Sequence, residues 1–227
     1  MLRPIKIAAS PDNVFAVSDT HFGHDKPFIY EPRGFKSVQE HDETLISRWN
    51  ETVPPDGVVI HCGDFCIQKD EAGFWEIVRR LNFGTLFALQ GNHNSGLKAA
   101  YQAVLQAQYP DAAIRGAEVY PLETCVDGDP ARKVVFLPEY VEMSVAKTRI
   151  VACHYPILSH HKMSAGSYHI CGHSHSNLPL TNPKTGVGRR LDVGIESFGR
   201  PISLTEVFRI LKNRETDSRD HHKTEES

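Results

Sequence analysis

Five short blocks of metal-binding residue types occur in a fixed order along this chain, and several follow a run of apolar, β-prone residues. The blocks are Asp19-Thr20-His21, Gly63-Asp64, Gly91-Asn92-His93, a lone His154 (followed by Tyr155-Pro156) and Gly172-His173-Ser174-His175. Carboxylate and amide oxygens together with imidazoles suit divalent transition metals, and pairs of such ions serve in the cleavage of phosphate esters. The pattern therefore calls for a fold that brings several strand ends to one place.

In the first half of the chain, short apolar runs typical of buried strands alternate with apolar residues at helical spacing. Three apolar runs predict buried strands, each ending beside a block, at residues 14–17, 58–60 and 85–89. Apolar residues at helical spacing predict helices after each of them, at residues 37–49, 71–81 and 97–105. Ser37 and Glu40 have the spacing of a capping box, which places the start of the first of these helices.

The second half reads mostly as β structure. Strands are predicted at residues 134–137, 140–145, 149–153, 168–171 and 191–193, with a tight turn at Ala146-Lys147. A second capping box, Ser203 with Glu206, opens a terminal helix that runs to Leu211. This order predicts an α/β fold in which two sheets pack together under helices. We expect one domain over residues 1–212 and a disordered polar tail over residues 213–227.

Composition narrows the class of protein. The 227 residues are 40 % hydrophobic and 23 % charged, as expected of a globular domain. The formal charge of -3 argues against a stable nucleic-acid partner, although it leaves room for a nucleotide substrate. No apolar run predicts a membrane span or a signal peptide. The five scattered cysteines are predicted to be reduced, which favours the cytoplasm. Oligomeric state is not predicted.

The spacing within the blocks suits metal binding. In extended backbone, alternate residues project to the same side, so Asp19 and His21 can act together, and so can the two histidines of the last block. Asp64 is a natural bridging carboxylate, and Asn92 offers a neutral oxygen. Each block alone is weak, because aspartate and asparagine are also common turn and cap residues. That reading explains the histidines poorly, since five of the 13 fall inside the blocks.

Taken together, the blocks resemble the calcineurin-like metallophosphoesterases over nearly the whole folded chain. The string Asp19-Thr20-His21-Phe22-Gly23-His24 is similar to the small cap-less bacterial and phage-type members. The resemblance implies a four-layer αββα sandwich of two mostly mixed β-sheets flanked by helices, with two metal ions at the sheet ends. It implies one ion held by Asp19, His21, Asp64 and His175, and a second held by Asp64, Asn92, His154 and His173.

The same resemblance implies an activity. The expected reaction is hydrolysis of a small phosphomonoester or phosphodiester, nucleotide-like in character, by attack of a metal-bridging hydroxide. His93 would face the leaving-group oxygen as the catalytic residue. Manganese is the first expectation for the ions, with iron, zinc, nickel or cobalt as alternatives.

Substrate contacts are predicted for His24, Arg33, Asn92 and His93. His24 either touches the substrate phosphate or orients a ligand, and Arg33 is either a phosphate clamp or a solvated surface residue. Tyr155, His160 and His161 follow the fourth block and either line the pocket or stay exposed.

One alternative belongs to a different class of function. A non-catalytic metal-binding scaffold or protein-interaction module could keep the same fold. The chain retains every predicted ligand and His93, which favours the enzyme. The second block continues as Phe65-Cys66-Ile67, without the arginine of the protein phosphatases, so a phosphoprotein substrate is disfavoured.

Overall fold

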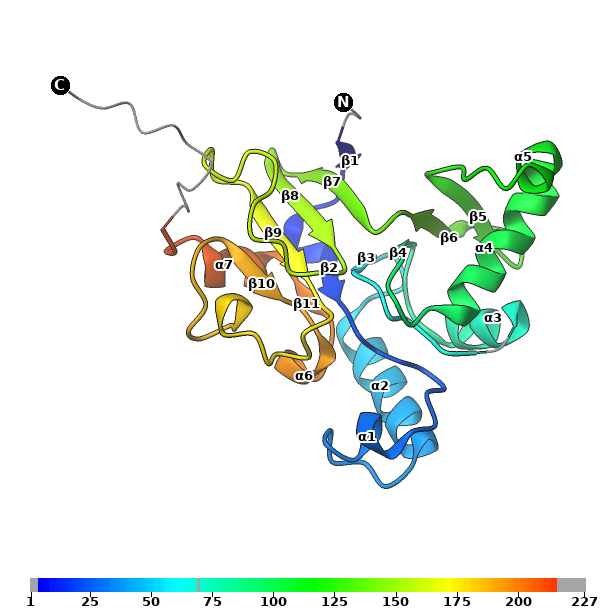
Figure 1. Ribbon diagram of the computed structural model, residues 1–227, viewed down its shortest axis with the longest axis horizontal. Coiled ribbons are helices and arrows are strands. Elements are labelled where there is room, and N and C mark those ends of the chain that lie inside the picture. The colour runs from blue at the N-terminus through cyan, green and yellow to red at the C-terminus, as the bar shows by residue number, and fades with distance from the viewer. Residues whose placement is uncertain (1–3, 69, 216–227) are drawn as a thin grey trace.

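The computed structural model describes residues 4–68 and 70–215, in which two mixed β-sheets pack against each other (Figure 1). The first sheet has the order β11-β2-β3-β4-β6-β5, formed by Ile202–Ser203, Val14–Val17, Val58–His61, Thr85–Leu89, Asp129–Leu137 and Leu122–Val126. The second sheet has the order β1-β7-β8-β9-β10, formed by Ile5–Ile7, Tyr140–Val145, Thr148–Cys153, Tyr168–Cys171 and Arg190–Asp192. Both sheets combine parallel and antiparallel pairs.

Alternation along the strands creates two hydrophobic cores. Phe15 and Val17 of β2 face the helices, whereas Val14 and Ala16 face the second sheet. Three long helices pack in the first core against the six-stranded sheet: α2 (Val38–Thr52), α3 (Glu71–Arg80) and α4 (Ser95–Gln108). The second core lies between the sheets and also takes in the apolar face of α7 (Leu204–Leu211). The architecture is therefore an α/β sandwich.

The outer face of the five-stranded sheet carries loops where the resemblance implies a helical layer. His169 and Arg190 are fully buried there. The backbone N–H of Ile157 donates to His169 Nε2 at 3.2 Å, and Arg190 donates to the carbonyl of Leu158. Residues 155–189 contain three prolines and four glycines and have no helical periodicity, which explains the absence of a long helix. The helical structure in these described loops is a single 3-10 turn, η2 (Pro179–Thr181).

The long elements predicted from the sequence are confirmed, with bounds shifted by a few residues. Ser37 accepts from the backbone N–H of Glu40 at 3.2 Å, and Ser203 with Glu206 forms the complete capping box. Ala146 and Lys147 both have positive φ, as a two-residue hairpin turn requires. The edge strands β1, β5 and β11 were not predicted. The short helices α1 (Pro27–Tyr30), α5 (Pro110–Ile114) and α6 (Ile195–Phe198) and the turn η1 (Pro11–Asn13) were also missed.

The structure describes the first residues after α7, up to residue 215. Arg214, in the predicted tail, donates hydrogen bonds to the carbonyls of Arg190, Asn182 and Pro183 at 2.8–2.9 Å. Residues 216–227 lie outside the described residues, so the predicted disorder there stays a prediction.

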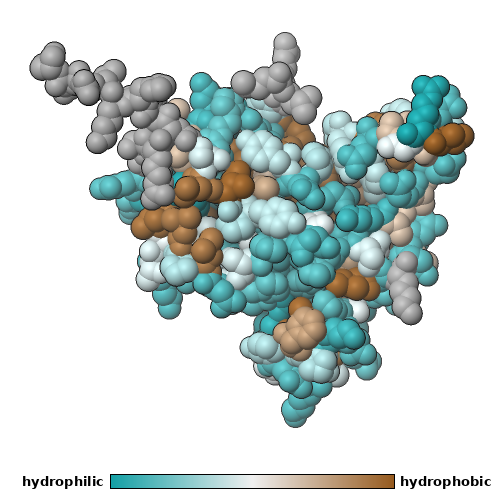
Figure 2. Space-filling view, in the orientation of Figure 1, coloured by the Kyte–Doolittle hydropathy of each residue, from teal (hydrophilic) through white to brown (hydrophobic). Residues whose placement is uncertain are grey.

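All five cysteines are free thiols, as predicted. In the described part of the chain, no helix has the length and apolar character needed to cross a membrane. The face in Figure 2 is mostly hydrophilic, with hydrophobic residues gathered over α7 and at the tip of α5. Ile114 in α5 is 78 % exposed, and Phe28 in α1 is 68 % exposed.

Candidate metal centre

The predicted blocks follow parallel strands of both sheets. β2, β3 and β4 are parallel neighbours, so their carboxyl ends share one edge, and the same holds for β8, β9 and β10 in the second sheet. A parallel bridge between Ser18 and Gly194 joins the two edges just beyond β2 and β10. The loops after these strands therefore meet, as ligand sites at the carboxyl ends of strands do in many α/β folds.

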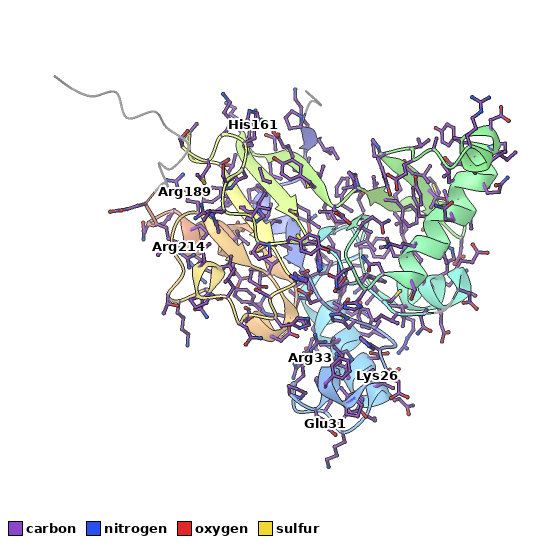
Figure 3. The ribbon with its side chains drawn as sticks, viewed as in Figure 1. Lys26, Glu31, Arg33, His161, Arg189 and Arg214 are labelled. Carbon is purple, nitrogen blue, oxygen red and sulfur yellow. The ribbon has the colours of Figure 1, made fainter. Side chains whose placement is uncertain are left out.

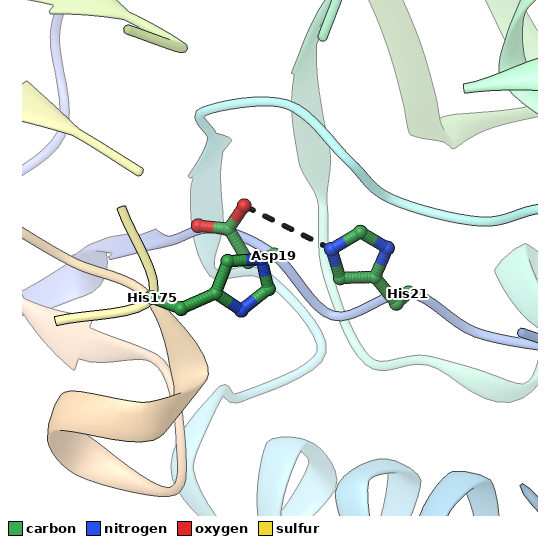
Figure 4. Close-up of side chains that lie close together, drawn as sticks. All are labelled: Asp19, His21 and His175. Carbon is green, nitrogen blue, oxygen red and sulfur yellow. Dashed lines mark ion pairs between the residues drawn. The ribbon is translucent and has the colours of Figure 1, made fainter. Parts of the chain in front are cut away.

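A first group of ligand-type side chains surrounds His21 (Figure 4). Its Nε2 lies 4.0 Å from Asp19 Oδ1 and 3.6 Å from Asp64 Oδ2. The His175 ring stacks on the His21 ring at a centroid distance of 5.2 Å. Asp19, His21 and His175 each offer a ligand atom, and these atoms all lie within 4.8 Å of one another. This group could hold a metal ion.

A second group shares Asp64 with the first. His154 Nε2 lies 3.5 Å from Asp64 Oδ2 and 2.7 Å from Asn92 Oδ1. His173 Nδ1 lies 3.1 Å from the same amide oxygen. Asp19, Asp64 and His154 also offer ligand atoms within 4.8 Å of one another. The structure thus brings together all seven side chains predicted as ligands, with Asp64 between the two groups.

Backbone strain is concentrated at this centre. Ten described residues other than glycine have positive φ, and five of them are predicted ligands: Asp19, His21, Asp64, His173 and His175, at 46–66°. A left-handed conformation costs a residue with a Cβ about 1–2 kcal/mol. Strain of this kind persists where the surrounding structure enforces it, and it is typical of functional sites.

Two block glycines allow close approach to the carboxylates. A Cβ at Gly172 would collide with Asp19 Oδ2 and Ser18 Oγ, and a Cβ at Gly91 would collide with Asp64 Oδ1. Any side chain at these two positions would displace a carboxylate. The glycines of the third and fifth blocks are therefore part of the centre itself.

The buried donor atoms suit a divalent cation. His21 is 1 % exposed, and its Nε2 has no hydrogen-bond partner. His154 Nδ1 donates to the Cys62 carbonyl at 2.9 Å, so in a neutral ring the Nε2 lone pair faces oxygen acceptors. Burial raises the pKa of Asp19 well above its ordinary value and lowers the pKa of His21. A cation would satisfy the lone pairs and offset the burial of the carboxylates.

Glu196, which the sequence analysis missed, fixes the orientation of one predicted ligand. His175 Nδ1 donates to Glu196 Oε1 at 2.6 Å, which leaves Nε2 for a metal and raises the pKa of His175. Glu196 is the second residue of α6. Its position beyond β10, at the edge where the blocks gather, is the signal that could have identified it.

Arg33 serves the centre in a way that the sequence did not predict. It lies in the turn after α1 (Figure 3). Its Nε and Nη2 donate to Glu196, Nη2 also donates to the Asp19 carbonyl, and Nη1 donates to the Thr20 carbonyl and to His41 Nε2. These bonds use all five N–H donors of a guanidinium. No donor remains for a substrate phosphate, so the predicted clamp is replaced by a positioning role.

His93 and His24 lie on the open side of the centre. The backbone N–H of His93 donates to Asp64 Oδ1 at 2.7 Å, while the residue itself is exposed and its ring lies 5.9 Å from that of His21. His24 Nδ1 lies 3.4 Å from His21 Nδ1. Both rings line a cavity of 820 Å³. These positions suit contact with a ligand, and that of His24 also suits orientation of His21.

The residues after the fourth block divide into two groups. The ring of Tyr155 lies 4.7 Å from that of His173, beside the centre. His160 is buried, with its ring 5.4 Å from that of His169 on the outer face of the five-stranded sheet. His161 pairs with Glu142 at 2.9 Å and lies far from Arg33 in Figure 3. His160 and His161 therefore do not line the candidate site.

No protein-family model matches this chain. The uncharacterized protein MJ1445 of Methanocaldococcus jannaschii is 33 % identical over 81 residues, which span 36 % of this chain and 46 % of that protein. The chain thus matches less than half of the length of that relative. The gene 66 protein of Mycobacterium phage L5 is 24 % identical over 225 residues, covering 88 % of this chain and 95 % of that protein.

Among solved structures, a protein of unknown function from Aquifex aeolicus, AQ665, has a similar fold. The match covers 87 % of this chain and 98 % of that chain, with a TM-score of 0.52 and 16 % identity. At this identity the likeness extends to the fold alone.

Proposed function

We propose that this protein is a metal-dependent phosphoesterase that hydrolyses a small, nucleotide-like phosphomonoester or phosphodiester. One observation supports this above the others. Six further side chains of ligand type, delivered by the ends of parallel strands from two sheets, gather around Asp64. A purely structural cluster would satisfy its buried donors and acceptors internally, whereas His21 Nε2 has no partner.

The donor set suits two divalent ions, with manganese our first expectation and iron, zinc, nickel or cobalt as alternatives. Asp19, His21, Asp64 and His175 would hold one ion, and Asp64, Asn92, His154 and His173 the other. When bound, the ions would supply positive charge to the phosphate oxygens and a water acidic enough to attack phosphorus near neutral pH.

The protein's own groups would position and complete this chemistry. Arg33 and Glu196 hold His175 in one orientation. The hydrogen bond from the backbone N–H of His93 to Asp64 fixes the backbone of His93, whose exposed imidazole lies beside the cavity. That imidazole would donate a proton to the departing oxygen, a task that histidine side chains commonly perform in enzymes.

The test is turnover of 4-nitrophenyl phosphate and bis(4-nitrophenyl) phosphate by the full chain with manganese. We expect activity that a chelator abolishes, and near-complete loss of activity and of bound metal in Asp64→Asn. Asp127→Asn is the matched control, because Asp127 pairs with Arg79 on the surface. Metal binding without turnover of either ester or of a nucleotide panel would contradict the proposal and favour the scaffold alternative.

A further inference from the structure

The 820 Å³ cavity beside His93 and His175 extends well past the predicted ligands. Its outer walls come from α1, the turn before α2, α2 itself and the segment around α6. The apolar residues that line it include Phe28, Ile29, Phe35, Leu45 and Ile195. Pockets of about 300–1,000 Å³ with apolar walls and few polar groups are typical of small-molecule sites.

An aromatic ring stands at the mouth of this cavity without a covering partner. Phe28 is 68 % exposed, although it belongs to a short helix whose next residue, Ile29, is buried. Its ring meets that of His24 edge to face, at 5.7 Å and 84°. Most of the Phe28 side chain is therefore available to contact a molecule bound in the cavity.

Among the described residues that line the cavity, one arginine has no carboxylate partner. Arg33 uses all its donors, and Glu196, the carboxylate among the described lining residues, is already bonded to Arg33 and His175. Arg48 has no carboxylate partner among the described residues. Its guanidinium carbon lies 6.0 Å from the Phe35 ring centroid, and its Nη1 would lie 3.3 Å from a Cβ at Gly199. The charge is thus placed between Phe35 and Gly199, free to bind an anion.

We propose that this cavity is the leaving-group subsite, and that it takes an aromatic group with a second negative charge, which Arg48 binds. The ring would pack against Phe28 and Phe35, and the distal carboxylate or phosphate would pair with the guanidinium. A nucleotide that carries a further phosphate belongs to this class. That the ring departs from phosphorus rests on the proposed function, whereas the binding of the anionic aromatic group does not.

The first test measures binding without turnover. The fluorescent ligands 2-naphthol and 6-hydroxy-2-naphthoate differ by one carboxylate and are titrated into the full chain. We expect the naphthoate to bind about tenfold more tightly than the naphthol, and Arg48→Gln to remove that preference. Arg209→Gln, at an exposed position on α7 outside the cavity, should keep it. Phe28→Ala should weaken both ligands several-fold, with little effect on folding because the side chain is exposed.

The second test measures turnover of 2-naphthyl phosphate and 6-carboxy-2-naphthyl phosphate. Water replaces the naphthol oxygen on phosphorus, and the naphthol leaves with a proton, so both reactions are followed by product fluorescence. We expect the ratio of the two kcat/KM values to fall about tenfold in Arg48→Gln, at unchanged metal content. Equal ratios and equal naphthoate binding in the wild type and Arg48→Gln would overturn the subsite. Arg48-dependent binding without turnover would support the subsite while contradicting the proposed function.

Discussion

Replacing Glu196 with glutamine tests whether the centre depends on residues outside the predicted ligand set. Glutamine keeps the size of the side chain but loses the charge that faces His175 Nδ1 at 2.6 Å and the Arg33 guanidinium. Without that charge, the hydrogen bond that orients the His175 ring and makes its Nε2 a stronger donor is weakened. The damage should be confined to the ion assigned to Asp19, His21, Asp64 and His175.

Loss of such an outer partner typically weakens metal binding 10–100-fold, which corresponds to about 1.4–2.7 kcal/mol. The assay is manganese content after equilibrium dialysis against a graded metal concentration, with urea unfolding to confirm an intact fold. We expect wild-type protein to bind two ions and Glu196→Gln to retain one of them at concentrations that still saturate the wild type.

Glu43→Gln is the matched control. Glu43 also pairs with an arginine, Arg80, but on the surface and far from the ligands, so its metal content should equal that of the wild type. Equal binding of both ions in Glu196→Gln would refute the positioning role. Loss of both ions at once would show that the two groups are not separable.

Three further predictions follow from individual residues. Gly172→Ala should lose bound metal because its Cβ would push Asp19 away, whereas Gly128→Ala, where the new Cβ would meet no neighbouring atom, should keep it; metal analysis of folded protein decides this. His93→Ala should lower kcat about 10²–10⁴-fold at unchanged metal content, and loss of metal would instead indicate a structural role. Burial lowers the pKa of His169 to about 3. Its folded-state pKa thus lies below the unfolded value near 6.5, so its contribution to stability is present above pH 6.5 and lost below it. The loss should reach about 2 kcal/mol at pH 5, and His169→Gln should lack it in urea unfolding.

The sequence was most informative where local chemistry decides structure. Apolar periodicity and two capping boxes placed the long helices and strands, because those signals lie within one element. The edge strand β1 was missed because three residues carry no period, and its pairing with β7 depends on a partner far along the chain. The loops over the five-stranded sheet were missed for a different reason, because the resemblance implied helices there.

In the candidate site, too, some features could be predicted from the sequence and others only from the structure. Residue type and order along the chain, together with the family resemblance that they carry, were enough to select all seven side chains that the structure brings together. The tasks of Arg33 and Glu196 could not be read from the sequence, because they depend on a contact between residues 163 positions apart. An arginine near a predicted phosphate site suggests a clamp until its five donors are counted in three dimensions.

In the proposed centre, Asp64 would lie between two metal ions. The most direct measurement is a crystal structure of the full chain soaked in manganese, with anomalous scattering used to locate the metal. We predict two anomalous peaks about 3.5–4 Å apart, both within bonding distance of Asp64, one beside His175 and the other beside His173. No peak at Asp64, or a single peak that leaves either histidine group empty at saturating manganese, would contradict the account.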